Sequence, residues 1–381
     1  HTHWDREWYQ TFQQFRMRLV NLVDNLLSLL DRDPNFLSFH LDAQTIVLED
    51  YLAIRPHNRE RLEAYIRAGR ITIGPWYQLN DEFLTSGEST IRSLLVGTRI
   101  ARSFGACLSI GYLPDQFGNL SQMPQIFRGF GIDNAIFGRG YQLAEDRKME
   151  FLWESPDGSQ VTASLMAYWY NNAQHFPADA QEALAYTQEL RARMAPVSAV
   201  SHLLLMNGVD HLEPQQDLSP ILAAVQPLLP EGDRLAHATI QEYMDAVKAE
   251  VRDKQIELQR YQGELREDRG GSCLAGTLST RMHLKQANHQ AQVKLEKYTE
   301  PFAAFALQAG ADYPYDFLLY AWKLLMQNHP HDSICGCSID QVHREMIPRF
   351  AQVDQIGDEL VSRSLQSVAD QVTLPGAEGA N

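Results

Sequence analysis

The chain has 381 residues, 44% of them hydrophobic, so it is long enough for a large core and too long for one ordinary domain. Its 33 Lys and Arg residues against 48 Asp and Glu residues give a formal net charge of −15, which argues against nucleic acid and anionic membrane surfaces as partners. Four cysteines do not make a disulfide framework, so we expect a reducing, cytoplasmic setting.

The first predicted element after the opening HTHWD is an amphipathic helix. Its apolar residues recur every three or four positions, at Phe12, Phe15, Leu19, Leu22, Val23, Leu26, Leu27 and Leu30. Short apolar runs then alternate with helical patterns, at residues 35–42, 70–77, 108–115, 134–140, 161–169 and 201–210. Strands that alternate with helices predict a parallel sheet.

Several of these runs end in a polar or charged residue. The residues are Asp42, Asp115, Arg139, Tyr168 and Asp210, and Asp5 follows the opening segment. In a parallel barrel the carboxyl ends of the strands meet at one mouth, so these side chains would line one pocket. The pattern favours a (β/α) barrel, although a doubly wound open sheet would give a similar string.

The strand patterns stop near residue 280, and three helical patterns follow at 282–307, 315–328 and 339–372. We therefore predict an α/β barrel domain over residues 1–275 and a helical domain over 276–381. Pro330 would end one helix, and Ser338 with Gln341 would form a capping box for the next. Residues 373–381 have the composition of a linker.

Alternate residues of an extended HTHWD segment point to the same side, so His1, His3 and Asp5 share one face. Imidazole nitrogens with a carboxylate oxygen suit zinc, and a catalytic zinc usually takes three protein ligands. The alternative is a polar loop whose histidines bond only to backbone carbonyls.

The segment HPHDSICGC, residues 329–337, allows two kinds of zinc site or none. A local structural zinc would use Cys335 and Cys337 with His329 and His331, but two tight pairs so close together strain a tetrahedral geometry. Buried free thiols are the simpler interpretation. The sharper hypothesis is that His331 reaches the barrel mouth and completes the site of His3 and Asp5.

Asp115 and Asp210 each close an apolar strand, where paired carboxylates for glycoside cleavage would stand. One would be an ionised nucleophile, and the other would keep a raised pKa and protonate the leaving oxygen. Each could instead simply cap the following helix. The aromatic residues beside these positions could stack on a sugar ring or belong to the core: Trp8, Trp76, Phe117, Tyr168 and Tyr170.

Five motifs in this order resemble glycoside hydrolase family 38 α-mannosidases, especially bacterial intracellular members: HTHWDREW, GYLPDQFGN, FGRG, NGVD and HPHDSICGC. The resemblance spans nearly the whole chain. It implies a (β/α)7-type barrel followed by a three-helix bundle domain that contributes His331 and Asp332 to the active site.

The resemblance also implies a retaining, exo-acting α-mannosidase that removes terminal mannose from an oligosaccharide or a small mannosyl compound. One zinc ion would be bound by His3, Asp5, Asp115 and His331. Asp115 would also be the nucleophile, and Asp210 the general acid and base, with Asp217 and Glu213 as alternatives. The mannose unit would be held by Trp8, Phe117, Arg139, Tyr170 (or Tyr168 in its place) and Asp332.

Family members have a strand before the position of His1 and β-rich domains beyond that of Asn381, so we expect this stretch alone to be weakly active or inactive. Members often associate, which makes a homo-oligomer a further expectation. Two other functions stay open. A metal-dependent amidohydrolase also uses HxH at a first barrel strand, but it would want more strand-end histidines. A sugar-binding module without catalysis would keep zinc for recognition.

Overall fold

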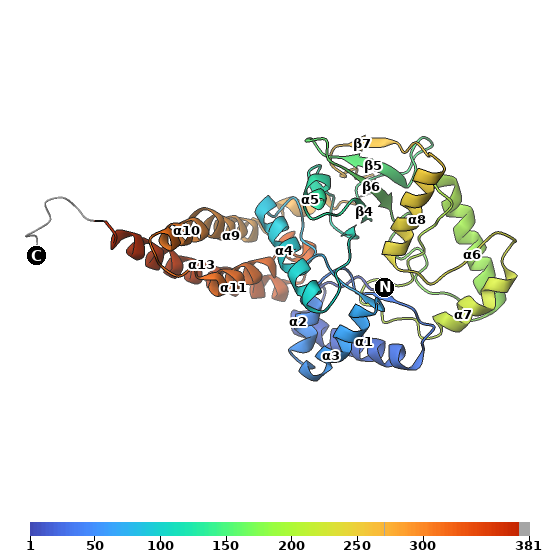
Figure 1. The fold of residues 1–381 in the computed structure, drawn as a ribbon, viewed down its shortest axis with the longest axis horizontal. Helices are drawn as coiled ribbons and strands as arrows, with labels where there is room; N and C mark the ends of the chain where they lie inside the picture. Colours follow the sequence, from blue (N-terminus) through green and yellow to red (C-terminus); the bar gives the residue numbers. More distant parts are fainter. Residues whose placement is uncertain (270, 373–381) are drawn as a thin grey trace, which may run out of the picture.

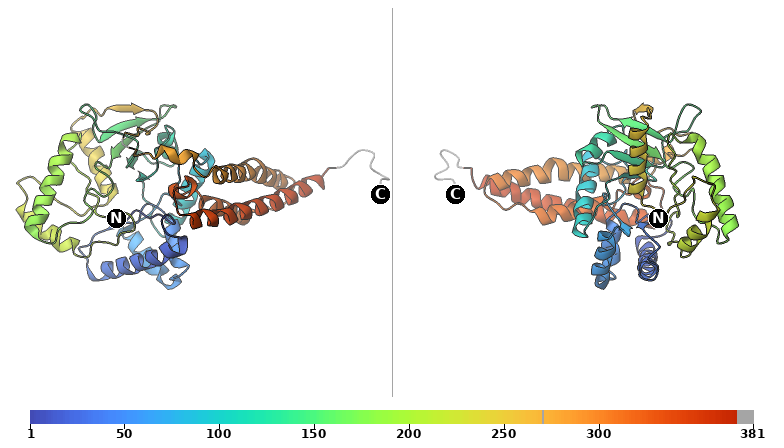
Figure 2. Two further views of the ribbon diagram at one scale, coloured as in Figure 1. Left: turned by 180° about the vertical axis from the view of Figure 1, so that it is seen from behind. Right: turned by 45° about the vertical axis from the view of Figure 1, so that its right-hand side comes forward.

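The structure is a computed structural model that describes residues 1–269 and 271–372, so the linker expected at 373–381 lies outside the described residues. An α/β body contains the N-terminal part of the chain, and a bundle of long helices projects from one side of it (Figure 1). The two views of Figure 2 show the same division, with the bundle's far end well away from the α/β body.

The α/β body is built on short parallel segments arranged in a ring. Thr2 forms a parallel bridge with Leu41, directly after β1 (Phe39–His40), and β1 pairs with β2 (Ile71–Thr72). The residues before β3 (Gly111–Leu113) contact those after β2, because Leu108 N–H donates to Ile73 O at 2.9 Å. In the sheet, β3 pairs with β4 (Asn134–Phe137), and β4 pairs with β6 (Gln160–Leu165).

Residues 203–210 close this ring without forming a regular ladder. Asn172 joins them to the segment just after β6, because its side-chain amide donates to Ala167 O and Leu204 O, both at 3.0 Å, and accepts from Met206 N–H at 2.8 Å. On the other side, His3 forms a parallel bridge with Asp210. The described chain thus has seven parallel segments around one centre, which confirms the predicted barrel and argues against the open sheet.

Two strands extend the sheet beyond the expected set. β5 (Glu150–Glu154) is antiparallel to β6, and β7 (Arg260–Gln262) lies parallel to β5 at the edge. β5 borders the ring strand β6, and Leu265, just after β7, pairs with Asn119 in the segment that follows β3.

Helices cover the outside of the ring, as the apolar periodicity predicts. They are α1 (Phe12–Arg32), α2 (Ile46–Leu52), α3 (Arg59–Arg67), α4 (Gly87–Ser103), α5 (Met123–Gly129), α6 (Ala180–Met194), α7 (Leu218–Val225) and α8 (Ile240–Asp253). Short 3₁₀ turns occur at Pro56–Asn58, Ala195–Val197, Gln226–Leu228 and Ala275–Ser279.

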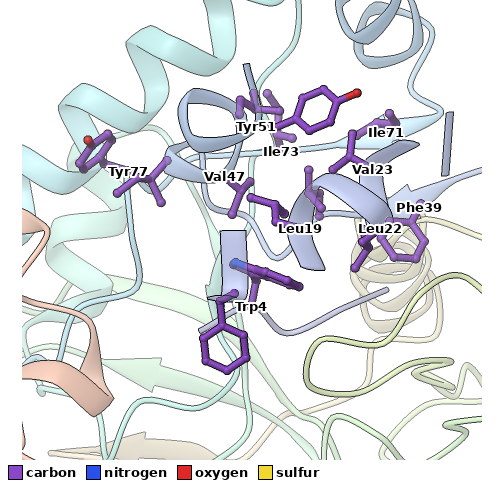
Figure 3. Packing of buried hydrophobic residues seen from close by; sticks show 14 of the residues in the cluster. Trp4, Leu19, Leu22, Val23, Phe39, Val47, Tyr51, Ile71, Ile73 and Tyr77 are labelled. Atoms are coloured by element: carbon purple, nitrogen blue, oxygen red, sulfur yellow. The ribbon is translucent and has the colours of Figure 1, made fainter. Parts of the chain in front are cut away.

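Helix α1 shows how sequence specifies this layer. Thr11 and Gln14 form a reciprocal capping box at its start. Its apolar face, including Leu19 and Leu22, then packs toward Trp4 and the strands, as Figure 3 shows. Burial of Trp4, which is only 2% exposed, anchors the opening segment just before Asp5.

The bundle consists of α9 (Met282–Val293), α10 (Glu300–Gln308), α11 (Tyr315–Met326) and α13 (Asp340–Ala369). A π-helical turn at Lys294–Thr299 joins α9 to α10, so the helical pattern at 282–307 forms one continuous helix with a π-helical turn inside it. The expected capping box at Ser338 and Gln341 is wrong. Ile339 is the N-cap of α13, and the Ser338 hydroxyl donates to Asp332 O at 2.9 Å instead.

Within the described residues, no helix combines the length and apolar character needed to cross a bilayer.

Candidate active site

His3 and Asp5 lie at the mouth of the ring because residues 1–3 are held on both sides as a strand. Nε2 of His3 lies 3.1 Å from Oδ1 of Asp5, and both side chains are at least 95% buried. His3 Nε2 is a buried nitrogen without a hydrogen-bond partner in the structure. A buried polar atom in that state needs a ligand, because an unsatisfied group is costly.

Asp42, at the end of β1, fixes the orientation of His3. Its Oδ2 accepts hydrogen bonds from Trp4 N–H and the Gln44 amide, both at 2.8 Å, and its Oδ1 accepts from Nδ1 of His3 at 3.2 Å. A carboxylate only accepts, so the Nδ1 of His3 carries a proton, and loss of the proton from Nε2 would leave a lone pair directed at Asp5. This carboxylate–histidine arrangement is the one that prepares a metal ligand.

Asp115 follows β3 and lies between two cationic partners. Its Oδ1 accepts from Nε of Arg139 at 2.8 Å, and its Oδ2 is 3.1 Å from Nε2 of His331. The same Oδ2 is 3.8 Å from Nε2 of His3. Asp115 does not cap a helix in this structure, so the alternative interpretation of this residue is wrong.

His331 comes from the helical part of the chain, where α12 (His331–Ile334) fills the loop between α11 and α13. Its ring stacks on that of His3 with centroids 5.4 Å apart, and its Nε2 lies 3.5 Å from Oδ1 of Asp5. The ligand atoms of His3, Asp5 and His331 all lie within 4.8 Å of one another. Residues more than 300 positions apart are thus brought together, as the sequence predicted.

Asp210 lies at the end of residues 203–210, directly beside His3 in the ring. Its Oδ1 accepts a hydrogen bond from the Tyr170 hydroxyl at 2.9 Å. Gly208 lets residues 203–210 lie close to the opening segment, because it has φ +135° and a Cβ there would overlap the backbone of His1.

The remaining predicted sugar-binding residues surround this group unequally. Phe117 packs edge-on against His331, with centroids 5.3 Å apart, and Arg139 lies over the Phe117 ring. Asp332 is buried, and its Oδ2 lies 3.8 Å from Nε2 of His331. Trp8 is farther out. Its carbonyl accepts from Ile339 N–H at 3.0 Å, and its ring packs on Tyr9.

The electrostatics divide the two candidate carboxylates. Burial favours the neutral form of Asp115, but the hydrogen bond from His331 and the charge of Arg139 outweigh it and lower the pKa of Asp115. Burial raises the pKa of Asp210, and nearby Asp5 and Asp115 raise it further. One carboxyl group is therefore held ionised and the other is biased toward the acid.

Histidines in the cluster reflect the same excess of negative charge. Burial opposes protonation of His331, yet Asp332 and Asp115 raise its pKa to about 9. Burial likewise opposes the charge on His3, and Asp42 and Asp5 raise the pKa of His3 well above its usual range. Such a group of imidazoles and carboxylates has the donor atoms to exchange its protons for a cation.

Other candidates lie outside this group. His1 contacts Tyr170 O rather than the ligand cluster, and Tyr168 is exposed with its hydroxyl on Arg193 O. The alternatives to Asp210 also lie elsewhere: Glu213 accepts from Asn25, and Asp217 begins α7. Trp76 is a core residue, since its indole N–H donates to Tyr112 O.

The four residues of the local structural zinc site, which was the less simple alternative, do not converge on one point. His329 is buried and bonds to Oδ1 of Asn288 at 2.8 Å, while His331 faces Asp115. Cys335 and Cys337 are free thiols, but only Cys335 is buried, so the expectation of two buried thiols is half wrong.

Sequence reasoning missed two residues that touch the cluster. His211 is fully buried, and its Nε2 lies 3.4 Å from Oδ2 of Asp5. The guanidinium carbon of Arg139 lies over the Trp169 ring, 4.4 Å from the centroid of that ring. His211 directly follows Asp210 in NGVDH, so its position beside a strand-end carboxylate was the available signal.

The donor set suits zinc in composition and placement. Two imidazole nitrogens and two carboxylates converge from the opening segment, β3 and α12, and the orphaned Nε2 of His3 faces into them. Asp42 supplies the hydrogen bond that a ligating histidine requires.

The comparisons with known proteins agree with this architecture. Residues 1–264 match the glycosyl hydrolases family 38 N-terminal domain, and residues 272–368 match the alpha mannosidase middle domain. A protein of Halalkalibacterium halodurans, provisionally named mannosylglycerate hydrolase, is 42% identical over all of this chain and 43% of its own length. Alpha-mannosidase 2C1 of Homo sapiens is 25% identical over all of this chain and 35% of its own length.

Solved structures extend the likeness to three dimensions. The crystal structure of an alpha-mannosidase from Enterococcus faecalis has a TM-score of 0.92 at 40% identity, covering 97% of this chain and 42% of that one. A 4-alpha-glucanotransferase from Thermococcus litoralis, covering 92% of this chain and 58% of that one, has a TM-score of 0.58 at 10% identity, a likeness of fold alone. The chain spans less than half the length of the first two relatives. It belongs to glycosyl hydrolase family 38, with that family's N-terminal domain followed by the alpha mannosidase middle domain.

Proposed function

We propose that the protein is a zinc-dependent retaining α-mannosidase that removes terminal α-linked mannose. The observation that carries the proposal is the meeting of His3, Asp5, Asp115 and His331 beside a second carboxylate, Asp210. Bound by these four residues, zinc would supply positive charge and hold adjacent sugar hydroxyls in place.

Asp115 is the proposed nucleophile. The hydrogen bonds from Arg139 and His331 keep it ionised and fix its orientation. Its attack on the anomeric carbon would form a covalent glycosyl ester, and water would later hydrolyse that ester.

Asp210 is the proposed general acid and base. Its raised pKa supports protonation of the leaving oxygen in the first step, and the resulting carboxylate would activate water in the second. The Tyr170 hydroxyl orients Asp210 Oδ1, while Phe117 and Asp332 border the space in which the sugar would lie.

Two domains contribute to the proposed site, since His331 and Asp332 come from the helical part. The Glu7–Arg349 ion pair, at 2.6 Å, ties that part to the opening segment. We therefore propose that residues 276–381 form a domain required for activity.

The test is hydrolysis of an aryl α-mannoside, with mannosylglycerate as a second substrate because a relative is named for it. The chain should be assayed side by side with a longer form of the protein that spans the full length of its relatives. We expect activity that a chelator removes and zinc restores, with retention of configuration in the released mannose. Asp115→Ala should lose it. Chelator-resistant activity would contradict the zinc-dependent mechanism.

The two competing functions have distinct outcomes in the same assay. Release of acetate or ammonia from an amide, with no action on mannosides, would favour an amidohydrolase. Tight mannose binding with no turnover in the longer form would favour a sugar-binding module.

A further inference from the structure

A second group of metal-binding side chains lies in the loop that carries His331. Asp332, Cys335 and Cys337 each contribute one ligand atom, and all three atoms lie within 4.8 Å of one another. The Sγ of Cys337 is 2.9 Å from Oδ1 of Asp332 and 3.2 Å from Sγ of Cys335. The proposed glycosidase chemistry uses neither cysteine.

The loop holds these atoms in place through its backbone. Gly336 has φ +89°, which turns the chain between the two cysteines, and a Cβ there would come 2.8 Å from Oγ1 of Thr280. Arg281 Nε donates to Gly336 O at 3.1 Å, and the Ser338 hydroxyl donates to Asp332 O. The loop backbone therefore holds the three side chains close together before any cation arrives.

We infer that Asp332, Cys335 and Cys337 form a second cation site, suited to a thiophilic divalent cation such as Zn²⁺ or Cd²⁺. Thiolates select such cations over Mg²⁺ and Ca²⁺. In the cation-free protein, Cys335 Sγ–H donates to Cys337 Sγ, and Cys337 Sγ–H donates to Asp332 Oδ1. A cation replaces both thiol protons.

Charge and access support a cation at this point. Once the thiols are deprotonated, the three ligands are anionic, and Lys285, whose Nζ lies 3.0 Å from Cys335 O, is a nearby positive charge. A divalent cation brings this group to neutrality. Two thiolates on one zinc at ~2.3 Å stand ~3.8 Å apart in a tetrahedral arrangement. The two sulfurs are 3.2 Å apart in the cation-free protein, and Cys337 is exposed, so its side chain can move outward to reach that separation. Water would then take the fourth ligand position on the cation.

A disulfide is the other use of two neighbouring thiols. It would join the two sulfurs and leave no role for the carboxylate of Asp332, which also converges on them. Convergence of an oxygen with two sulfurs is therefore the feature that favours a cation.

Occupancy of the second site would affect catalysis, and this consequence rests on the proposed function. The cation would engage Oδ1 of Asp332, a predicted mannose-holding carboxylate whose Oδ2 lies 3.8 Å from His331. An excess of thiophilic cation should then inhibit hydrolysis, whereas the first cation supports it.

Cadmium binding to the metal-depleted, reduced protein tests the inference without an activity assay. Equilibrium dialysis should give two cadmium ions per chain, and a thiolate-to-cadmium absorption band should appear in the ultraviolet. Cys335→Ser should lose one ion and the band, while Cys107→Ser, remote from the loop, should keep both. Circular dichroism verifies that each variant is folded.

A parent protein that binds one cadmium ion without the band would overturn the second site. So would a band that survives in Cys335→Ser. With an aryl mannoside as substrate, excess cadmium should inhibit Cys335→Ser at least tenfold more weakly than the parent. If no mannoside is hydrolysed but the second ion and its band appear, the proposed function fails and the cation site stands.

Discussion

Replacing Asp42 with Asn should weaken zinc binding although Asp42 is not a proposed ligand. The amide keeps the size of the carboxylate but puts an NH₂ donor where an oxygen accepts. If that NH₂ takes the place of Oδ1, which faces Nδ1 of His3 at 3.2 Å, the imidazole proton moves to Nε2, the atom that faces Asp5. If it turns the other way, it opposes the N–H groups of Trp4 and Gln44, which now bond to Oδ2 at 2.8 Å.

Loss of such a partner typically lowers metal affinity by ~10–100-fold, or ~1.4–2.8 kcal/mol. Competition with a chromophoric chelator measures the zinc affinity directly. Asp253→Asn is the matched control, since Asp253 is exposed and pairs only with neighbouring Arg252. A folded Asp42→Asn protein that binds zinc within twofold of the parent would refute the argument.

Three further predictions concern the scaffold. Arg349→Met leaves fully buried Glu7 without its cation and should cost ~3–5 kcal/mol of unfolding free energy in urea; the loss should shrink when Glu7→Gln is added, and an equal loss would contradict the pairing. Gly97→Ala should lower Tm strongly, because a Cβ there overlaps the backbone of Trp76, whereas Gly87→Ala, with open space around it, should not; similar melting of the two would be contrary evidence. Burial lowers the pKa of His40 to about 3 from 6.5, so between these two pH values the unfolded state binds a proton that the folded state does not. The free energy of unfolding should therefore fall as the pH drops through this window, by up to ~1.4 kcal/mol per pH unit. His40→Asn should flatten this dependence of stability on pH, and an unchanged dependence would contradict the prediction.

Residues whose role depends on local pattern were predictable from the sequence. Periodicity and capping identified α1, and the polar ends of apolar runs identified Asp115 and Asp210 as neighbours at one mouth. The placement of His331 beside His3 was one hypothesis among those the residues allowed, and the family motifs selected it, because nothing in local spacing shows which distant loop reaches the barrel.

Other features depend on contacts that sequence patterns do not encode. Residues 203–210 are an apolar run, yet they join the ring through the side chain of Asn172 rather than a ladder. Asp42 gains its role from a positive φ and from donors on two segments. The capping box at Ser338 failed because α13 begins one residue later than expected, with Ile339 as its N-cap.

Identification of the residue that becomes glycosylated tests the central claim most directly. A fluorinated mannosyl inhibitor that forms a slowly hydrolysed glycosyl ester should be incubated with zinc-loaded protein, and the labelled peptide mapped by mass spectrometry. We predict a single ester on Asp115, absent in Asp115→Ala. An ester on Asp210 or on another carboxylate would contradict the assigned roles.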